Sequence, residues 1–265
     1  MELKQYQDIL LGMVTDFAAM CRETGIHFYL VGGGSLGAVR HNGFIPWDDD
    51  LDIALPRRDY DRLPELVRQC LPANYELIYR ENARIYQLLD RNHPITMVNN
   101  NMAMENGTSY FAFIDLFPLD GCPAGERARK RYIRKQKRLR FWYKLCYIQY
   151  CHPGGNHSRL ENLVIRIARG LHTEKLLARR RPRIGEKWEA LVRKYDYETS
   201  EWVTASYGIY GIRDTFPRTV VGEGLLLPFE NTELPIFENY DRYLTQLYGD
   251  YMTPVKMKGK AHLAE

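Results

Sequence analysis

The sequence predicts a mixed α+β fold, in which a basic helical segment follows an α/β core. Over residues 1–123, amphipathic helical patterns alternate with short runs of β-branched and aromatic residues. Residues 124–218 are largely helical in pattern and strongly basic, whereas residues 219–265 combine turn residues with one further helix. We therefore expect a core, a basic helical segment and a C-terminal segment that packs on the core, over these three ranges.

The expected elements follow from local patterns. Apolar residues recur at helical spacing over residues 7–23, which predicts an amphipathic helix packed on the core. Aromatic and β-branched residues predict a strand over 27–31, and Ser35 is placed to cap a short helix over 36–40. Acidic and apolar residues alternate over 50–55, as in a half-buried strand. The remaining expected elements are a helix over 58–71, strands over 75–78, 85–89, 95–98 and 110–117, and a helix over 238–248 that Gly249 ends.

The composition excludes several classes of protein. The 265 residues are 45% hydrophobic, which is enough to build a core. No apolar run approaches the roughly 20 residues needed to span a bilayer, and the first residues lack the basic and apolar stretches of a secretory signal. The five cysteines include no Cys-x-x-Cys pair, which indicates a reducing compartment. We therefore expect a cytoplasmic protein.

A glycine turn followed by a cluster of acids is the most informative feature. Gly33, Gly34 and Ser35 follow a predicted strand, and glycines let backbone N–H groups approach phosphate oxygens at a helix N-terminus. Asp50 and Asp52 lie two residues apart on a strand and so point to the same face. Two carboxylates on one face suit Mg²⁺, with Mn²⁺ as an alternative, together with substrate phosphates. The combination predicts transfer of a phosphorus-centred group from a nucleotide-like donor.

Further residues are candidates for the same site. Asp115 interrupts an apolar strand, where a charge is costly unless it is paired, hydrogen-bonded or bound to metal. Arg40 could neutralise developing phosphate charge. Trp47 could stack on the donor, make a cation–π contact with a choline headgroup or simply anchor the core. The expected phosphate- and donor-binding residues are Gly33, Gly34, Ser35, Arg40, His41, Trp47 and Asp48, of which His41 has a structural role as its alternative.

Residues 30–60 resemble the signature of the LicD family of the nucleotidyltransferase superfamily, to which fukutin and fukutin-related protein are related. The family's glycine-serine turn and paired acidic motif match Gly33-Gly34-Ser35 and Asp50-Leu51-Asp52. Residues 113–120 are similar to the family's second block, and the stretches 228–230 and 248–252 give weaker support. The resemblance implies a nucleotidyltransferase-like core with a mixed sheet. It also implies that Asp115 either completes a metal site with Asp50 and Asp52 or acts as the general base.

The resemblance also implies a reaction. LicD-like enzymes move phosphocholine from CDP-choline to a sugar hydroxyl of a cell-surface glycan, and relatives transfer ribitol phosphate from CDP-ribitol. We therefore expect a CDP-alcohol donor, CDP-choline first, and a teichoic acid, lipopolysaccharide or capsule acceptor, which could be lipid-linked. Two alternatives stay open. A nucleotidyltransferase that moves a nucleoside monophosphate to a small-molecule or sugar hydroxyl would use the same acids, and a non-catalytic binding module would use only the basic helices.

The basic charge is concentrated in one region. Residues 125–195 hold about 21 of the 37 Lys and Arg and about five acids. Basic residues interleaved with Trp and Tyr suit an anionic membrane or a polyanionic glycan, whereas an ordinary solvated face is the alternative. No nucleic-acid motif accompanies the charge, so no nucleic acid is expected. The residues expected to contact the inner face of a membrane lie between Arg127 and Arg140, namely Arg129, Lys130, Arg134 and Lys137.

Several polar residues have weaker assignments. Cys146, Cys151, His152 and His157 could hold zinc, but their spacing matches no common finger, and core thiols with loop histidines are the alternative. Asp120 is expected to be structural and to lie in a turn after the strand that holds Asp115. Asp250 and His262 reach the site only if the C-terminal segment folds back.

Overall fold

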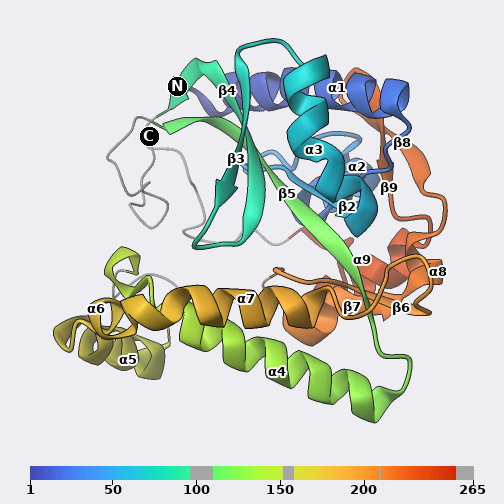
Figure 1. Ribbon diagram of the computed structural model, residues 1–265. Coiled ribbons are helices and arrows are strands. Elements are labelled where there is room, and N and C mark those ends of the chain that lie inside the picture. Colours follow the sequence, from blue (N-terminus) through green and yellow to red (C-terminus); the bar gives the residue numbers. More distant parts are fainter. Residues whose placement is uncertain (96–109, 152–157, 209, 255–265) are drawn as a thin grey trace.

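A single mixed sheet forms the centre of the protein (Figure 1). The computed structural model describes residues 1–95, 110–151, 158–208 and 210–254. The strands are β1 (Tyr29–Val31), β2 (Asp52–Pro56), β3 (Tyr75–Arg80), β4 (Ile85–Ile95), β5 (Tyr110–Cys122), β6 (Trp202–Ala205), β7 (Thr215–Pro217), β8 (Leu225–Phe229) and β9 (Thr232–Ile236). The helices are α1 (Leu3–Thr24), α2 (Gly32–His41), α3 (Arg57–Cys70), α4 (Glu126–Leu145), α5 (Arg159–Gly170), α6 (Thr173–Leu177), α7 (Arg181–Val192), α8 (Arg218–Val221) and α9 (Tyr240–Tyr248), with 3₁₀ turns η2 (Ile148–Tyr150), η3 (Ala178–Arg180) and η4 (Gly211–Asp214).

The sheet has the strand order β3-β4-β5-β2-β1-β9-β8. β2 pairs with β5 in parallel and with β1 in antiparallel orientation, and β9 joins the other side of β1 in parallel. The last residues of β5 pair instead with β6, and β6 pairs with β7. The mixed strand directions confirm the predicted α+β class.

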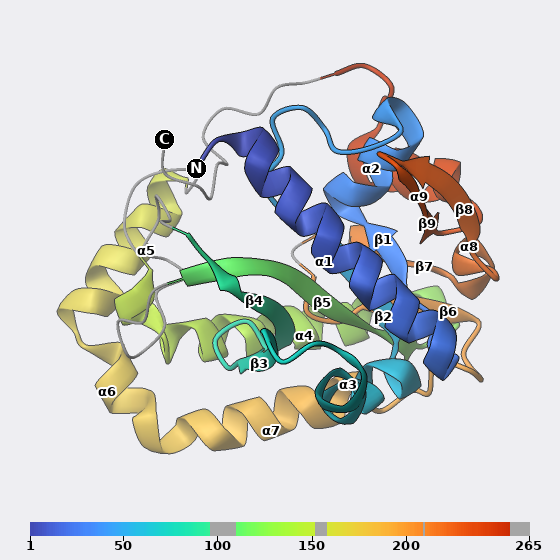
Figure 2. The ribbon, with the colours of Figure 1, turned by 90° about the horizontal axis from the view of Figure 1, so that it is seen from above.

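Helices cover both faces of the sheet (Figures 1 and 2). Ile53 and Leu55 of β2 and Leu116 of β5 belong to the apolar cluster that α1 and α3 cover. Ala54 and Leu119 belong instead to a second cluster with α9, and Phe117 packs against a third cluster with α4 and α7. Because successive side chains of a strand alternate between faces, the second face is the one that α4, α7 and α9 share.

Most expected elements are confirmed, with shifted boundaries. The predicted helices over 7–23, 58–71 and 238–248 correspond to α1, α3 and α9, and Gly249 ends α9 with φ +73°. The expected strands over 75–78, 85–89 and 110–117 lie within β3, β4 and β5. Of the expected strand over 95–98, only residue 95 lies within the described residues.

Two predictions about the glycine turn and the acids are wrong in detail. Ser35 does not cap a helix, because α2 begins at Gly32, directly after β1, and Ser35 lies inside it. Gly32 makes this junction possible, since its φ of +58° is a conformation that favours glycine. The acidic strand begins at Asp52 rather than at Asp50, so Asp50 precedes it.

Asp120 lies within β5 rather than in a turn. It is buried and accepts two hydrogen bonds from Arg57, at 2.7 and 2.8 Å, in a fork-like ion pair. The structural role expected for Asp120 is therefore confirmed, and the pair fastens the start of α3 to the end of β5.

The basic region forms a helical layer, with α4 packed against α7. Among the helices that the structure describes, none combines the length and the hydrophobicity of a membrane span. The sheet crosses the three predicted ranges, since β6 and β7 come from residues 124–218 and β8 and β9 from residues 219–265. The C-terminal segment thus packs on the core as part of its sheet.

Candidate active site

Asp52 and Asp115 are brought together by the pairing of β2 with β5. The two residues are register partners in this parallel pair, and Asp52 also lies opposite Val31 of β1. Both side chains have the parity of Ala54 and Phe117, so they lie on the face that carries α4, α7 and α9. Neighbouring strands are about 4.8 Å apart, which places the two carboxylates side by side.

The glycine turn lies directly beside Asp52. A Cβ atom on Gly32 would lie 3.5 Å from Oδ2 of Asp52 and 3.8 Å from the hydroxyl of Tyr248. The backbone N–H of Gly32 donates to the hydroxyl of Tyr243 at 3.1 Å. A Cβ atom on Gly33 would lie 2.4 Å from Oδ2 of Asp48, so a larger residue there would have to displace the Asp48 carboxylate. The predicted proximity of the glycine turn and the acids is therefore confirmed for Asp48 and Asp52.

Gly34 and Ser35 lie deeper than Gly33. A Cβ atom on Gly34 would lie 3.0 Å from Cδ1 of Leu51, which is a close apolar contact. Ser35 is fully buried, and its hydroxyl has no hydrogen-bond partner among the described residues. The first turn of α2 therefore contains a buried hydroxyl that receives no hydrogen bond from the described residues. Buried polar groups without a hydrogen-bond partner are uncommon in folded proteins.

Asp115 is held by a chain of buried polar side chains. Nε2 of Gln87 donates to Oδ1 of Asp115 at 2.6 Å, and Nη1 of Arg80 donates to Oε1 of Gln87 at 2.8 Å. Gln87 is 1% exposed and Arg80 is 7% exposed. Gln87 lies opposite Asp115 in the β4–β5 ladder, so the backbone pairing fixes the contact. This series of hydrogen bonds orients one oxygen of Asp115. No feature of the sequence predicted it.

The charges of three acids act on the buried hydroxyl of Tyr6. Burial raises the pKa of Tyr6 above its ordinary value, and the carboxylates of Asp49, Asp115 and Asp50 raise it further. Asp49 is buried, whereas Asp50 is half-buried just before β2. The N-terminal helix therefore contributes to the environment of the acids.

Arg40, His41 and Trp47 form a separate group at the other end of α2. Arg40 donates from Nε to Nε2 of His41 at 3.0 Å and from Nη1 to the carbonyl of Tyr251 at 2.9 Å. The His41 and Trp47 rings meet edge to face, with centroids 6.4 Å apart. Burial and the neighbouring Arg40 charge lower the pKa of His41. Trp47 immediately precedes Asp48, so the loop connects this group to the glycine turn.

Two tyrosines of α9 are site residues that sequence reasoning missed. Burial raises the pKa of Tyr243 and of Tyr248 far above the ordinary value, and the charge of Asp52 adds to both shifts. The only sequence signal for Tyr243 is its place on the apolar face of the helix. The C-terminal segment therefore folds back on the site, but it brings tyrosines rather than Asp250, which is exposed. His262 lies outside the described residues.

The acid pair fits a metal that arrives with its substrate. No group of three His, Cys, Asp or Glu side chains among the described residues is arranged to hold a metal ion. Mg²⁺ commonly takes one or two carboxylates and completes its shell with water and substrate phosphates. Asp52 and Asp115 could supply two such ligands, and the ligand roles of Asp50, Asp52 and Asp115 all stay predictions.

The suggested zinc cluster receives no support from the two cysteines that the structure describes. Cys146 is buried, and its thiol donates to the carbonyl of Trp142 at 3.3 Å. Burial raises the pKa of both Cys146 and Cys151, which disfavours the thiolate that binds zinc. His152 and His157 lie outside the described residues.

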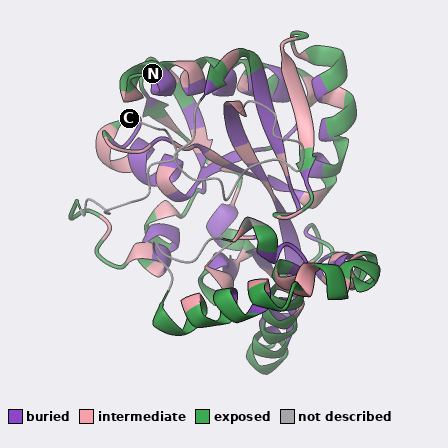
Figure 3. Ribbon diagram, turned by 90° about the vertical axis from the view of Figure 1, so that its left-hand side faces the viewer, coloured by how far each residue is buried: buried purple, intermediate pink, exposed green. Residues whose placement is uncertain are grey.

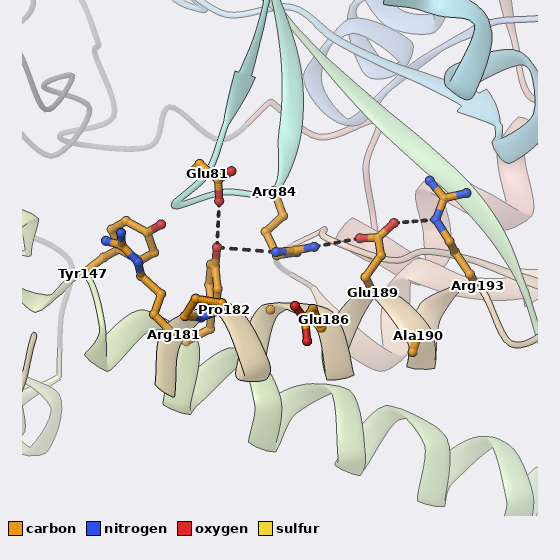
Figure 4. A pocket seen from close by; sticks show the side chains of 11 residues that line it. Glu81, Arg84, Tyr147, Arg181, Pro182, Glu186, Glu189, Ala190 and Arg193 are labelled. Carbon is orange, nitrogen blue, oxygen red and sulfur yellow. Dashed lines mark hydrogen bonds and ion pairs between the residues drawn. The ribbon is translucent and has the colours of Figure 1, made fainter. Parts of the chain in front are cut away.

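A cavity of about 730 Å³ lies between α7 and the β3–β4 turn (Figure 4). Arg84 from the turn donates to Glu189 of α7 at 2.8 Å, and Arg193 donates to the same carboxylate at 2.5 Å. Although burial favours the neutral acid, hydrogen bonds from Tyr207, Arg84 and Arg193 lower the pKa of Glu189 to about 2. None of the predicted site residues lines this cavity, and its ion pairs fasten the helical layer to the sheet.

Comparison with known proteins finds a relative that matches most of the chain. The chain is similar to the lipopolysaccharide cholinephosphotransferase LicD of Haemophilus influenzae, with 24% identity over 252 residues, 94% of this chain and 91% of the relative. Shorter similarities link it to uncharacterised proteins of Rickettsia prowazekii, 34% identical over 70 residues (26% of each chain), and Rickettsia typhi, 32% identical over 68 residues (26% of this chain and 22% of the relative).

A family match covers the predicted site. Residues 25–144 match the family described as LicD/FKTN/FKRP, nucleotidyltransferase domain. This range includes the glycine turn, the acids before β2 and Asp115 on β5. The resemblance seen in the sequence is thereby confirmed: residues 25–144 match the LicD family, and most of the chain is similar to a LicD protein.

Proposed function

We propose that the protein transfers phosphocholine from CDP-choline to a hydroxyl of a lipopolysaccharide-type glycan, in a reaction that requires Mg²⁺. The observation that carries the proposal is the register pair of Asp52 and Asp115 beside the glycine end of α2. The similarity to a lipopolysaccharide cholinephosphotransferase over most of both chains supports phosphocholine as the transferred group.

The proposed reaction exchanges one phosphorus–oxygen bond for another. The acceptor hydroxyl oxygen bonds to the phosphorus that carries choline, and the bond from that phosphorus to the bridging oxygen breaks. CMP leaves with the electron pair, and the hydroxyl proton passes to a base. Asp115 is the candidate base unless it serves as a metal ligand, because Gln87 fixes its carboxylate in the site.

The chain's own groups bind and orient the donor. The first N–H groups of a helix have no acceptor within the helix, so those of Gly33 and Gly34 are candidates to meet phosphate oxygens. Asp52 and Asp115 would hold Mg²⁺, which when bound neutralises charge on the diphosphate and on the leaving group. Trp47 and Arg40 lie at the far end of α2 and are assigned to the remainder of the donor.

The experiment is an assay of both products. Purified protein is incubated with CDP-choline, Mg²⁺ and a short lipopolysaccharide-type oligosaccharide, and the acceptor and the released compounds are identified by mass spectrometry. We expect the acceptor to gain phosphocholine while CMP is released. Parallel reactions with other CDP-alcohols test the choice of alcohol, and omission of Mg²⁺ tests the metal requirement.

The same assay recognises the alternatives. A nucleotidyltransferase would attach CMP to the acceptor and release phosphocholine. The same two carboxylates would serve that reaction, so the products and not the geometry separate the two functions. If no CDP-alcohol supports transfer, the proposal is overturned, whether or not the protein binds CDP-choline. The binding-module alternative would then remain.

A further inference from the structure

Helix α5 turns an apolar face toward solvent. Leu160, Leu163, Val164 and Ile167 of α5 and Leu171 just after it are 70%, 53%, 38%, 53% and 62% exposed. At 100° per residue these five positions fall within an arc of about 100°, so they form one continuous stripe. Contiguous exposed apolar surface of this kind marks an interaction site rather than a random surface. The stripe is therefore the strongest unpartnered surface among the described residues.

The opposite side of α5 is fixed to the protein. Ile165 and Ala168 are buried and pack against Ile148 of η2. Nη1 of Arg169 donates to the carbonyl of Cys151 at 2.7 Å, and the hydroxyl of Thr173, at the start of α6, donates to the carbonyl of Leu145 at 3.3 Å. The helix is thus held with its apolar stripe outward. Its N-terminus is also capped, because Ser158 and Glu161 form a capping box.

The surroundings of the stripe are basic. Residues 158–183 contain eight Lys or Arg and two Glu. Arg159 and Arg166 lie next to the stripe on α5, and both are exposed. The two acids are engaged locally, since Glu161 belongs to the capping box and Glu174 lies 3.3 Å from the ring of His172. Further exposed bases follow on α6, η3 and the start of α7, namely Lys175, Arg179, Arg180 and Arg183.

The adjoining elements add apolar side chains. Leu176 of α6 is 71% exposed. Phe141 and Trp142, in the last turns of α4, are 49% and 45% exposed. Figures 1 and 2 place α5 and α6 at the end of the helical layer opposite β6 and β7, and Figure 3 shows how much of this layer is exposed. The combination of Leu, Ile, Phe and Trp with Arg and Lys is typical of helices that lie in a membrane interface.

We infer that the apolar face of α5 docks the protein on an anionic lipid bilayer. The helix lies along the surface, with its leucines and isoleucine among the acyl chains and Arg159 and Arg166 at the headgroups. A second copy of the chain is the less suitable occupant, because a symmetric contact would bring two strongly basic surfaces together. The inference goes beyond the proposed reaction and does not depend on it, since docking needs neither donor nor acceptor.

The docking surface differs from the one expected from the sequence. Of the residues named there, Arg129 is buried, stacks on Trp202 at 3.4 Å and donates to the carbonyl of Pro123 at 3.1 Å, so the prediction is wrong for Arg129. Lys130 pairs with Glu126 at 2.5 Å. For the exposed residues Lys130, Arg134 and Lys137, membrane contact stays a prediction. Helix α5 supplies the apolar side chains that these three residues lack.

The test is co-sedimentation of the full chain with lipid vesicles. The wild-type protein is mixed with vesicles of phosphatidylglycerol and phosphatidylcholine, or of phosphatidylcholine alone, at low and high salt. We expect binding to the anionic vesicles that weakens with salt, because exposed charges are screened. Leu163→Asp with Ile167→Asp should reduce the partition constant by about a hundredfold or more, since burial of each leucine-sized side chain changes it by roughly tenfold or more. Arg159→Gln with Arg166→Gln should reduce binding less and remove part of the salt dependence.

Matched controls test whether a loss of vesicle binding is specific to the apolar face of α5. Leu226→Asp changes a side chain of β8 that is 60% exposed and should leave vesicle binding unchanged. Thermal unfolding verifies that each variant is folded. We expect all variants to fold, because the replaced side chains are exposed. Light scattering without vesicles measures self-association. Failure of the wild type to bind anionic vesicles, equal binding by the α5 double variant, or a dimer that this variant dissociates would each overturn the inference.

Discussion

Asp52 of β2 and Asp115 of β5 face the same side of the sheet as register partners, although more than 60 residues separate them. Two ionised carboxylates this close repel each other unless a cation or hydrogen-bond donors compensate. Gln87 provides one donor to Asp115, and the backbone pairing prevents the two residues from moving apart. The fold therefore holds the two carboxylates together, as the proposed binding of a cation and a diphosphate requires.

Replacing either member of the pair should abolish transfer without unfolding the protein. Asp52→Asn and Asp115→Asn each remove one negative charge from the proposed Mg²⁺ site, where the ion stabilises charge during phosphoryl-type transfer. Turnover is measured with CDP-choline, and donor affinity by calorimetry with and without Mg²⁺. If Asp115 is only the base, Asp115→Asn should retain Mg²⁺-dependent donor binding while turnover falls at least about a hundredfold.

Asp50→Asn is the matching comparison for this pair. The acidic motif predicts the same loss of transfer, although Asp50 lies before β2 rather than on it. A near wild-type rate in Asp50→Asn would remove Asp50 from the site. Near wild-type rates in both Asp52→Asn and Asp115→Asn would contradict the catalytic assignment altogether.

Gln87→Glu should separate positioning from folding. A carboxylate at this position can still pair with Arg80, but it repels Asp115 instead of donating to it. We expect a folded protein with turnover reduced by about tenfold to a hundredfold and a pH–rate profile shifted toward higher pH, because two adjacent acids hold a proton more tightly. Gln87→Met removes both hydrogen bonds and should also destabilise the protein by about 1–3 kcal/mol. An unchanged profile in a folded Gln87→Glu variant would limit Gln87 to a structural role.

Gly33→Ala should weaken donor binding. The new Cβ would lie 2.4 Å from Oδ2 of Asp48 and would force that carboxylate away from the start of α2. We expect a raised KM for the donor, which steady-state kinetics measures. Gly12→Ala on α1 is the control, because a Cβ there meets nothing within 4 Å. This control should gain about 0.5–1 kcal/mol of stability from helix propensity with unchanged kinetics. Equal KM values for both variants would argue against a donor site at Gly33.

Asp214 should make stability depend on pH. Burial raises its pKa to about 6, although the N–H of Tyr210 donates to it at 2.7 Å. The folded pKa lies above the unfolded one, so the stability that the protonated acid contributes is complete below about pH 4 and is lost as pH rises through about 6. Asp214→Asn should therefore stabilise the protein more at about pH 7.5 than at about pH 4.5, by up to about 3 kcal/mol. Urea unfolding at both pH values measures the difference, and equal effects at both would contradict the shift.

The sequence predicted elements with strong local signals. α1, α3 and α9 have clear apolar periodicity, and the acidic and apolar alternation located β2 to within two residues. The start of α2 was misplaced, because a helix that begins at Gly32 without a capping side chain leaves no sequence signature. The pairing of β5 with β6 was not predicted either, since long-range strand pairing depends on tertiary packing rather than local pattern.

The site residues that could be predicted are those that belong to a local sequence motif. The glycine turn and Asp52 were placed together correctly, and Asp115 was recognised as a charge in an apolar strand. Gln87 and Tyr243 were missed, because a glutamine in a strand and a tyrosine on an apolar helix face look like ordinary packing residues. Their roles follow from partners that only the folded chain brings near.

The hydrogen bond from Gly32 to Tyr243 joins residues that are 211 positions apart. Ribosomes add about 5–20 residues per second, so the glycine turn emerges roughly 10–40 s before the tyrosine that accepts from its amide. During that time β2 and β5 can pair, but α9 has not been synthesised. The glycine turn is therefore completed only after both acids have been synthesised, and translation itself delays the appearance of the complete candidate site.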